Sequence, residues 1–413
     1  ISSIVQSALV TGHVRSPAMS WSYRGLVPIP PLLPQVFATL WAVLAPHLIL
    51  CLLAAPFRSW LAPLGLLAVL WCLVDPVGRQ IWPGGHSRLI GIYGGKEEHL
   101  GRQRRALTRV AAAYRPTPWL WSGDQRTLAV MAGGQRPDEV LEVHRIAGSR
   151  GELLVYLRAG THTQIVLAIG GIVGDPDSPF ILDMQKASKA KGWGFGMWIT
   201  RPDLVPGNLS GAPDPSDVRD IHSCLQFLKS HSPQSKVHMV GYSMGAQMVL
   251  LYCGRYGDAA LCHSAAAVSG SFTPVPLYCE HYRRYWQPWL TAQLKLLFYE
   301  RFGEELPPRE KVRSASSYLQ LVDCLPHIGP VSKLCASSDA HAERHGICRP
   351  LLFFASADDP FHNPLGDLGI DRSLPWVLYY VTKCGGHVAW PDGWSGDCRR
   401  FHTSVVLEFF AAS

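Results

Sequence analysis

A chain of 413 residues has room for two or three domains, and its composition excludes several classes of protein. The formal net charge is +7 but charged residues make up only 17% of the chain, so the sequence lacks the dense basic runs of nucleic-acid-binding proteins. The 11 cysteines form no C-x-x-C pair, which argues against a disulfide framework and against a zinc ribbon. The mild basic excess fits work at an anionic membrane surface.

The first 74 residues contrast with the rest of the chain. Residues 1–34 are polar and then rich in proline, which predicts an irregular leader; because residue 1 is Ile rather than Met, we expect further residues before it. Residues 35–55 (QVFATLWAVLAPHLILCLLAA) hold no charged side chain, and their 21 positions match the roughly 20 helical residues that span a bilayer core. A second apolar run, residues 60–74, is shorter. Residues 35–74 therefore predict a membrane anchor, as one span or a tight hairpin, the alternative being a buried helix pair.

Residues 75–113 are rich in basic side chains and predict a linker between the anchor and a globular domain. Basic residues beside a span favour the cytoplasmic side of a membrane. Because Arg15 and Arg24 precede the apolar region, the asymmetry is modest and the topology stays open.

From about residue 139 onward, strand-like and helix-like segments alternate. Residues 139–146 and 152–158 predict an antiparallel strand pair. Further strands are expected within residues 164–174, 193–200, 236–240, 263–271, 350–360 and 376–387. Helices are expected within residues 180–192, 215–231 and 405–412, and directly after residue 243. Strands that alternate with helices indicate an α/β fold, with a mostly parallel sheet and helices on both of its faces.

Residues 271–349 interrupt this alternation between two expected core strands. They carry an aromatic and basic stretch (YCEHYRRYWQPWL) and a polar one (ASSDAHAERHG), and we expect an inserted lid over the sheet edge within a domain that spans 114–413. His341 and His345 are four residues apart, as some zinc ligands are. Because no third ligand and no H-E-x-x-H order is evident, we interpret them as lid surface and predict no metal site.

One short motif, Gly241-Tyr242-Ser243-Met244-Gly245, lies between an expected strand and an expected helix. Glycines on both sides allow a serine to occupy a strained strand-to-helix turn with its hydroxyl exposed above the sheet. Ser243 is therefore a candidate nucleophile, the alternative being an ordinary serine in a glycine-flanked loop.

A serine needs a base to remove its proton and an acid to orient that base. Asp358 and Asp359 follow one expected strand, and His387 follows the last one. Each position lies past the carboxyl end of a strand, where open α/β sheets collect functional groups. We predict a triad of Ser243, Asp359 and His387. Asp359 is preferred because it precedes the proline turn; Asp358 would then brace the histidine loop, although the sequence leaves the choice between them open.

The tetrahedral intermediate of such a reaction needs two backbone N–H donors. One is expected from Met244, directly after the nucleophile. The other is expected from Ile172, in the turn Gly170-Gly171-Ile172-Val173-Gly174, the alternative being a plain glycine turn.

Several of these segments together resemble the membrane-anchored family 4 of the α/β-hydrolases, which includes plant embryogenesis-associated proteins and medium-chain lipid esterases. The resemblance covers residues 110 to 410 and lies in YRPTPWLWSGDQRTL (114–128), DIHSCLQFL (220–228), GYSMGAQMVLLYCGRYG (241–257), SADDPF (356–361) and GGHVAW (385–390). One departure is Gly170-Gly171, where the family usually has His-Gly.

The resemblance implies hydrolysis of carboxylic esters, such as acylglycerols, phospholipids or short acyl esters, by Ser243, Asp359 and His387. It implies a lipid or acyl-ester substrate, a location at a membrane and no nucleic-acid partner. No nucleotide motif is present, so no cofactor is predicted. Two alternatives remain: acyl transfer to an alcohol by the same triad, or a catalytically silent scaffold on a hydrolase fold.

Overall fold

The computed structural model covers most of the chain from Leu89 onward. It describes residues 89–117, 120, 122–132, 139–149, 151–158, 160–172, 178–199, 216–273, 282–302, 309–324, 331–362, 369–393 and 399–413. The expected leader (1–34) and membrane anchor (35–74) lie outside the described residues. Among the helices of the described part, none combines the length and apolar character needed to cross a membrane.

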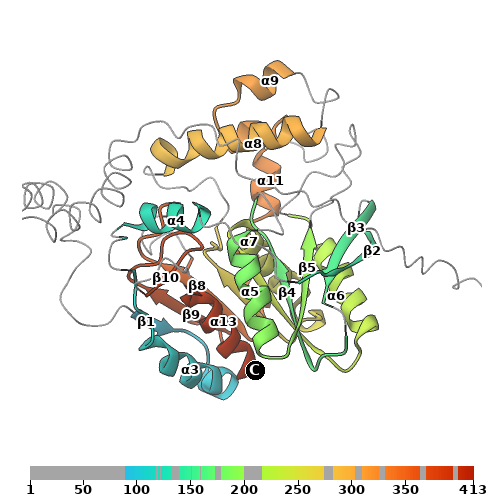
Figure 1. Cartoon of the computed structure of the whole chain (residues 1–413), viewed down its shortest axis with the longest axis vertical. Helices are drawn as coiled ribbons and strands as arrows, with labels where there is room; N and C mark the ends of the chain where they lie inside the picture. The colour runs from blue at the N-terminus through green and yellow to red at the C-terminus, as the bar shows by residue number, and fades with distance from the viewer. Residues whose placement is uncertain are drawn as a thin grey trace, which may run out of the picture.

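The described residues form one large, mostly parallel sheet in the order β1-β9-β8-β7-β6-β4-β5-β3-β2 (Figure 1). The strands are β1 (Leu89–Tyr93), β2 (Glu142–Gly148), β3 (Gly151–Leu157), β4 (Gln164–Ile169), β5 (Gly194–Ile199), β6 (Lys236–Tyr242), β7 (Ser264–Val268), β8 (Leu351–Ser356) and β9 (Val377–Thr382). Neighbouring strands run parallel along the part of the sheet ordered β5-β4-β6-β7-β8-β9. At one edge β3 pairs antiparallel with β5 and with β2, and at the other edge β1 pairs antiparallel with β9. The expected parallel sheet and the antiparallel pair β2–β3 are confirmed.

Helices pack on both faces of this sheet. They are α3 (Glu97–Ala111), α5 (Pro179–Ala190), α6 (Arg219–His231), α7 (Met244–Tyr256) and α13 (Phe401–Ala411), with the one-turn η3 (Gly257–Ala259) after α7. One apolar layer joins the strands to α6 and α7, and the other joins them to α3, α5 and α13. In β4, Leu167 belongs to the first layer, whereas Val166 and Ala168 belong to the second. A strand buried on both faces needs apolar residues at every position, which explains the unbroken apolar runs in the sequence.

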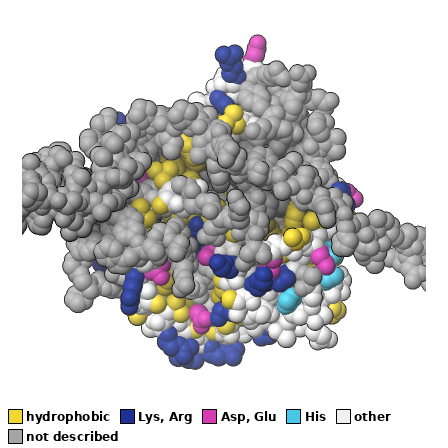
Figure 2. Space-filling model, viewed as in Figure 1, with side chains coloured by type: hydrophobic (Ala, Val, Ile, Leu, Met, Phe, Trp, Pro, Cys, Tyr) yellow, Lys and Arg dark blue, Asp and Glu magenta, His cyan; other side chains and the backbone are white. Residues whose placement is uncertain are grey.

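The prediction of a linker over residues 75–113 is wrong from Leu89 onward. That part of the chain supplies the edge strand β1, which pairs with β9, and the helix α3, which joins the same apolar layer as α13. The basic residues obscured an amphipathic helix, because Leu100 and Leu107 are buried while Arg102, Arg105 and Arg109 are exposed on the outer side. Figure 2 shows Lys and Arg side chains gathered at the bottom of the molecule, where Figure 1 places α3.

Between β7 and β8 the chain forms a helical insertion, in the region expected to hold a lid. Its described elements are η5 (Tyr282–Trp286), α8 (Gln287–Phe302), α9 (Arg309–Ser314), α10 (Tyr318–Val322), α11 (Val331–Ser337), α12 (Ala340–Glu343) and η7 (Arg344–Gly346). Figure 1 places α8, α9 and α11 at the top of the molecule. The insertion has its own apolar cluster, which also contacts Ile172 after β4 and Phe361 after β8. It therefore packs at the end of the sheet where the parallel strands finish.

Two further elements lie at that end of the sheet. The helix α4 (Gly123–Ala132) precedes the first antiparallel strands, and a small two-stranded sheet pairs β10 (Pro391–Asp392) with β11 (Arg399–Arg400). The helix α4 contacts the loop that carries His387, and β10 follows that loop in the chain.

Candidate active site

Ser243 occupies a sharp turn between β6 and α7. Its backbone angles are φ 55° and ψ −118°, a left-handed region that non-glycine residues rarely adopt. Such strain persists where the surrounding structure enforces it, and it concentrates at functional sites. Ser243 N–H donates to the carbonyl of Val268 at 2.9 Å, and Ser243 C=O accepts from Ala246 and Gln247 in the first turn of α7. The serine is thus the residue at which strand becomes helix.

The two glycines of the motif are required by close backbone approach. A Cβ at Gly241 would lie 2.2 Å from the carbonyl oxygen of Gly245, and a Cβ at Gly245 would lie 2.3 Å from that of Gly170. Both distances are shorter than any real Cβ contact, so only glycine fits at these positions. The sequence motif therefore encodes the turn and also its packing against the end of β4.

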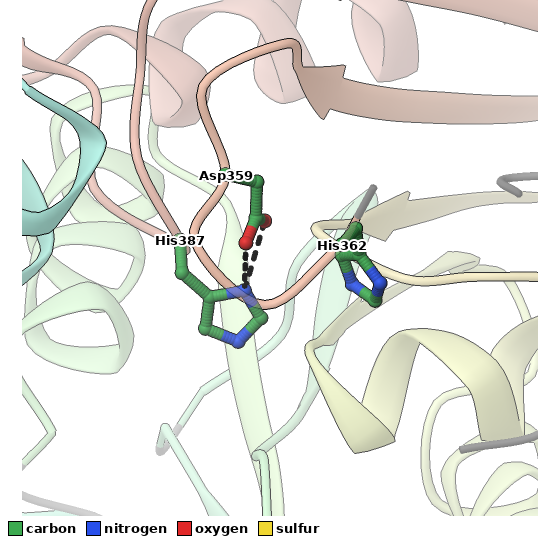
Figure 3. Close-up of side chains that lie close together, drawn as sticks. All are labelled: Asp359, His362 and His387. Atoms are coloured by element: carbon green, nitrogen blue, oxygen red, sulfur yellow. Dashed lines mark hydrogen bonds and ion pairs between the residues drawn. The ribbon is translucent and has the colours of Figure 1, made fainter. Parts of the chain in front are cut away.

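His387 connects Ser243 to Asp359 through hydrogen bonds. Figure 3 shows the two contacts between His387 and Asp359. Its Nε2 lies 2.8 Å from Ser243 Oγ, and its Nδ1 lies 2.9 Å and 3.1 Å from the two carboxylate oxygens of Asp359. Because a carboxylate only accepts, Nδ1 donates to Asp359, and Nε2 is left to accept from the serine hydroxyl. The structure brings all three residues predicted for the triad into one continuous chain of hydrogen bonds.

The carboxylate of Asp359 is buried and ionised. Burial on its own raises the pKa of this carboxyl, but the neighbouring rings of His387 and His362 and the hydrogen bonds from His387 and from the N–H of Phe361 outweigh it and lower the pKa below its usual value. An ionised carboxylate at this place can orient the imidazole and stabilise its positive charge when it takes a proton.

Asp358 lies beside Asp359 in the sequence and has a different set of partners. One of its oxygens accepts the N–H groups of Gly385 at 2.8 Å and Gly386 at 2.9 Å, directly before His387. The other oxygen pairs with the guanidinium of Arg126. The structure thus places Asp359 at the imidazole and Asp358 under the loop that carries it, the division preferred from the sequence.

Helix α4 packs against the loop that carries His387. The sequence analysis did not predict this contact. Thr127 Oγ1 accepts the backbone N–H of His387 at 2.8 Å and donates to the carbonyl of Gly123 at 2.7 Å. Arg126 is 3% exposed. Burial lowers the pKa of its guanidinium, but the Asp358 carboxylate more than offsets this and raises it. The resemblance over residues 114–128 covers these side chains without giving them a role.

A second support comes from the end of β7. Ser269, at φ 53°, accepts the N–H of Val388 on its Oγ at 2.9 Å. Its carbonyl oxygen lies 3.3 Å from Nε2 of His362. Val388 itself has φ 52°, so the residue after the candidate base is also held in a strained conformation. Strain on both sides of the site indicates a framework that fixes the imidazole closely.

The two expected oxyanion donors lie on either side of Ser243. Met244 begins α7, and the first N–H groups of a helix have no acceptor within it. The glycine turn after β4 approaches from the other side, because a Cβ at Gly171 would lie 3.4 Å from Ser243 Cβ and 3.9 Å from Ser243 Oγ. Ile172 follows, and its side chain packs against the apolar cluster of the insertion. The roles of Met244 and Ile172 as donors stay predictions.

The insertion contacts the site through aromatic rings. Phe361 stacks on the ring of His387, with centroids 4.1 Å apart, and also contacts Tyr282 and Trp286, with centroids 5.1 Å apart in each case. Trp286 Nε1 donates to Asp124 of α4 at 2.6 Å. The insertion, the candidate base and the helix below its loop therefore form one packed unit.

One further histidine lies at the site. Within the described residues, Asp359, His362 and His387 are a group of potential metal ligands, with the three ligand atoms within 4.8 Å of one another (Figure 3). The sequence analysis did not single out His362. This histidine lies one residue past the segment SADDPF (356–361), which carries the resemblance.

Comparisons with known proteins bear on the fold. A family model described as the α/β hydrolase fold matches residues 184–323. The chain is 27% identical over 237 residues to a monoacylglycerol lipase of Saccharomyces cerevisiae, covering 51% of this chain and 48% of the lipase. It is 24% identical over 285 residues to the medium-chain fatty acid ethyl ester synthase/esterase 2 of the same yeast, covering 60% of this chain and 61% of that protein.

Among solved structures, the esterase domain of a Rhodothermus marinus protein aligns with a TM-score of 0.42 and 14% identity, covering 66% of this chain and 98% of that domain. The chain spans 48% and 61% of the lengths of the two yeast proteins. The sheet order, the family match and the turn at Ser243 agree on an α/β-hydrolase fold.

Proposed function

We propose that this chain, which has the α/β-hydrolase fold, is a serine hydrolase of carboxylic esters. The observation that carries the proposal is the continuous chain of hydrogen bonds from Asp359 through His387 to Ser243, at a strained turn between strand and helix. A serine nucleophile, a histidine base and an orienting carboxylate are what acyl transfer through a serine requires.

In the first half of the reaction, Ser243 Oγ attacks the carbonyl carbon of the ester while His387 Nε2 takes the hydroxyl proton. Asp359 keeps the other ring nitrogen protonated and stabilises the imidazolium that forms. The N–H groups of Met244 and Ile172 stabilise the oxyanion. His387 then donates its proton to the alcohol oxygen as the alkoxy group leaves, and an acyl-serine remains.

In the second half, His387 takes a proton from water, the hydroxide attacks the acyl carbonyl, and the proton returns to Ser243 as the acid departs. An alcohol in place of the water would give a new ester by the same steps. That alternative is supported by the similarity to a yeast protein named as both an ethyl ester synthase and an esterase.

Lipid or other acyl esters are the proposed substrates. The support comes from the name of the yeast monoacylglycerol lipase that this chain resembles and from the apolar cluster of the insertion, which contacts Phe361 and Ile172 beside the site. Such a cluster suits a hydrocarbon chain better than a polar acyl group. The proposed alternative of a silent scaffold is disfavoured by the complete set of hydrogen bonds.

The function is tested by the hydrolysis of p-nitrophenyl esters from acetate to laurate by the purified full-length chain. The wild type is expected to hydrolyse them, and Ser243→Ala to reduce kcat by roughly 10⁵-fold or more, as the loss of a triad serine does elsewhere. Ser230→Ala is the matched control, because its hydroxyl is exposed on α6 and bonds only to the local carbonyl of Phe227. Equal rates for wild type and Ser243→Ala would reject the proposal.

Release of an ethyl ester when ethanol is added to the same assay distinguishes acyl transfer from hydrolysis. A product mixture dominated by the ester at low ethanol concentration would identify transfer as the main reaction. A product mixture dominated by the acid would identify hydrolysis.

Residues 35–74 are proposed to anchor the chain to a membrane, because 21 successive positions carry no charge. The full-length chain is expected to float with liposomes and to resist extraction by alkaline carbonate. Extraction by carbonate would show a peripheral association and would contradict the anchor.

A further inference from the structure

His362 is a titratable side chain at the active site that the proposed reaction does not use. It is half-buried, follows Phe361 in the loop after β8, and is oriented beside the carboxylate of Asp359 (Figure 3). Its Nε2 faces the carbonyl oxygen of Ser269 at 3.3 Å. Because a carbonyl oxygen only accepts, Nε2 carries the ring proton in this contact and Nδ1 is left with a lone pair. A second imidazole lone pair thus lies close to the triad carboxylate.

We propose that Asp359, His362 and His387 form an inhibitory binding site for a divalent zinc ion. The three ligand atoms lie within 4.8 Å of one another. Two imidazole nitrogens and one carboxylate oxygen, with a water as fourth ligand, are a donor set that zinc takes in proteins.

The geometry needs a small rearrangement to close around the ion. Ligand atoms of a tetrahedral zinc site with bonds of about 2.0–2.1 Å lie about 3.3 Å apart, which is about 1.5 Å closer than the widest separation here. His362 is the side chain that moves most easily, because its contact with Ser269 at 3.3 Å is longer than the contacts of His387 with Asp359 at 2.9 Å and with Ser243 at 2.8 Å.

The carboxylate of Asp359 is held in place beside the two imidazoles, because its Oδ1 accepts the N–H of Phe361 at 2.9 Å. Ser243 is half-buried rather than sealed off, so the ion has the same entry as the substrate.

Zinc at this site removes the base of the reaction, whichever ring nitrogen of His387 binds it. Bound at Nε2, the ion occupies the lone pair that accepts the proton of Ser243. Bound at Nδ1, the ion displaces the ring proton to Nε2, which then donates to Ser243 Oγ instead of accepting from it. In both cases the imidazole stays neutral and cannot take the serine proton, so acylation stops.

The inhibition rests on the proposed hydrolase function, whereas the binding does not, and the test separates the two. Hydrolysis of a p-nitrophenyl ester by the full-length chain is titrated with ZnCl₂ in a buffer that does not bind metals, and the rate is expressed relative to the metal-free rate of each variant. We expect half-inhibition of the wild type at micromolar zinc, reversed by a chelator.

His362→Gln is the diagnostic variant, because the glutamine amide keeps a donor for the carbonyl of Ser269 and removes the imidazole. It is expected to need at least tenfold more zinc for half-inhibition. His345→Gln is the matched control, an exposed histidine of the insertion, and is expected to respond like the wild type. Equal zinc sensitivity of wild type and His362→Gln, or loss of sensitivity in His345→Gln, would overturn the proposal.

Binding is measured independently of activity with Co²⁺ as a spectroscopic probe on Ser243→Ala, which cannot turn over. The account predicts the visible absorption bands of a four-coordinate Co²⁺ ion with one ion bound per chain, lost when Asp359→Asn or His362→Gln is added. Absence of these bands, together with no binding of Zn²⁺ to the same variant in isothermal titration calorimetry up to 0.1 mM ZnCl₂, on the order of 100 times the expected dissociation constant, would reject the metal site whether or not the protein hydrolyses esters.

Discussion

The turn that carries Ser243 and the loop that carries His387 are built in different ways. The serine turn is encoded locally: Gly241 and Gly245 flank the serine within five residues, and Gly241 lies against the backbone of Gly245. The histidine loop is held by residues that are far apart in the chain, since Thr127 of α4 is 260 positions away from His387. Local geometry can thus be recognised from a motif, whereas the position of the base depends on the whole fold.

The largest expected effect comes from the adjacent aspartates, of which Asp359 contacts the imidazole and Asp358 holds the loop before it. Asp359→Asn is expected to lower kcat by on the order of 10⁴-fold, because an amide in place of the orienting carboxylate selects the wrong imidazole tautomer. Asp358→Asn is expected to lower it by roughly 10- to 100-fold, since it weakens bonds to Gly385 and Gly386 without touching the ring and hydrogen bonds to charged groups contribute about 1.5–3 kcal/mol. Steady-state kinetics on a p-nitrophenyl ester decides, and a larger loss in Asp358→Asn would reverse the assignment.

Removing Arg126 tests the long-range support. In Arg126→Met the Asp358 carboxylate loses its charged partner, and breaking a buried ion pair from one side costs about 3–5 kcal/mol. Asp358 is 21% exposed at its side chain, so the lower end of that range is expected. Chemical denaturation measures the effect.

The matched control is the double variant Arg126→Met/Asp358→Asn, which removes both charges. It is expected to recover part of the lost free energy of unfolding. A double variant less stable than Arg126→Met alone would show that the pair does not act as a unit.

Gly245→Ala tests the local part of the comparison. The added Cβ would lie 2.3 Å from the carbonyl oxygen of Gly170, a backbone atom that cannot move aside cheaply. Overpacking of this kind costs about 1–3 kcal/mol. Gly196→Ala in β5 is the control, because its Cβ would find its nearest neighbour at 3.6 Å. If both variants melt at the same temperature, the glycine motif is not needed for close approach.

A smaller effect is expected at Thr127. Thr127→Val removes the acceptor for the backbone N–H of His387, and leaving a buried donor unsatisfied costs about 1–3 kcal/mol. A decrease of kcat by roughly tenfold with little change in KM is expected, because each 1.4 kcal/mol in the barrier is about tenfold in rate. Thr127→Ser keeps the hydroxyl and should restore the rate; failure to do so would assign the effect to packing.

The last test concerns His238, near the start of the strand that leads to Ser243. Burial lowers its pKa to about 3, with His263, Lys236 and Lys229 acting in the same direction. Below its ordinary value of 6.5 the unfolded chain binds a proton at this ring that the folded chain does not bind until the pH approaches 3. The free energy of unfolding should therefore fall by up to about 1.4 kcal/mol per pH unit as the pH decreases through this window.

The readout for this prediction is the slope of stability against pH, which His238→Gln should make shallower. The readout is the slope and not the stability at neutral pH. An unchanged slope would show that another group dominates the acid response.

Features that a few neighbouring residues encode were predicted from the sequence, and features that depend on residues far apart in the chain were not. The strands and the serine turn were predicted because runs such as residues 164–169 and the motif around Ser243 carry their information within a few positions. Asp359 and His387 were predicted as partners of Ser243 because each lies in the loop after a strand, and the carboxyl ends of parallel strands meet at one edge of the sheet. Arg126 and Thr127 were missed, since their role exists only after α4 packs under the histidine loop.

The error in the linker has a related cause. Between residues 89 and 111 the density of arginines suggested a solvated segment, whereas the apolar positions of α3 fit the layer beside α13. An edge strand such as β1 also gives a weak signal, because its partner β9 lies almost 300 residues away in the chain. The anchor at residues 35–74 stays a prediction, as do the donors Met244 and Ile172.

The central claim, that Ser243 is a nucleophile activated by His387 and Asp359, is tested most directly by reaction with a fluorophosphonate followed by peptide mapping. The account predicts one phosphonyl group on the peptide that contains Ser243 in the wild type, no adduct in Ser243→Ala, and much slower labelling in Asp359→Asn. An unmodified wild type, or an adduct that persists in Ser243→Ala, would contradict it.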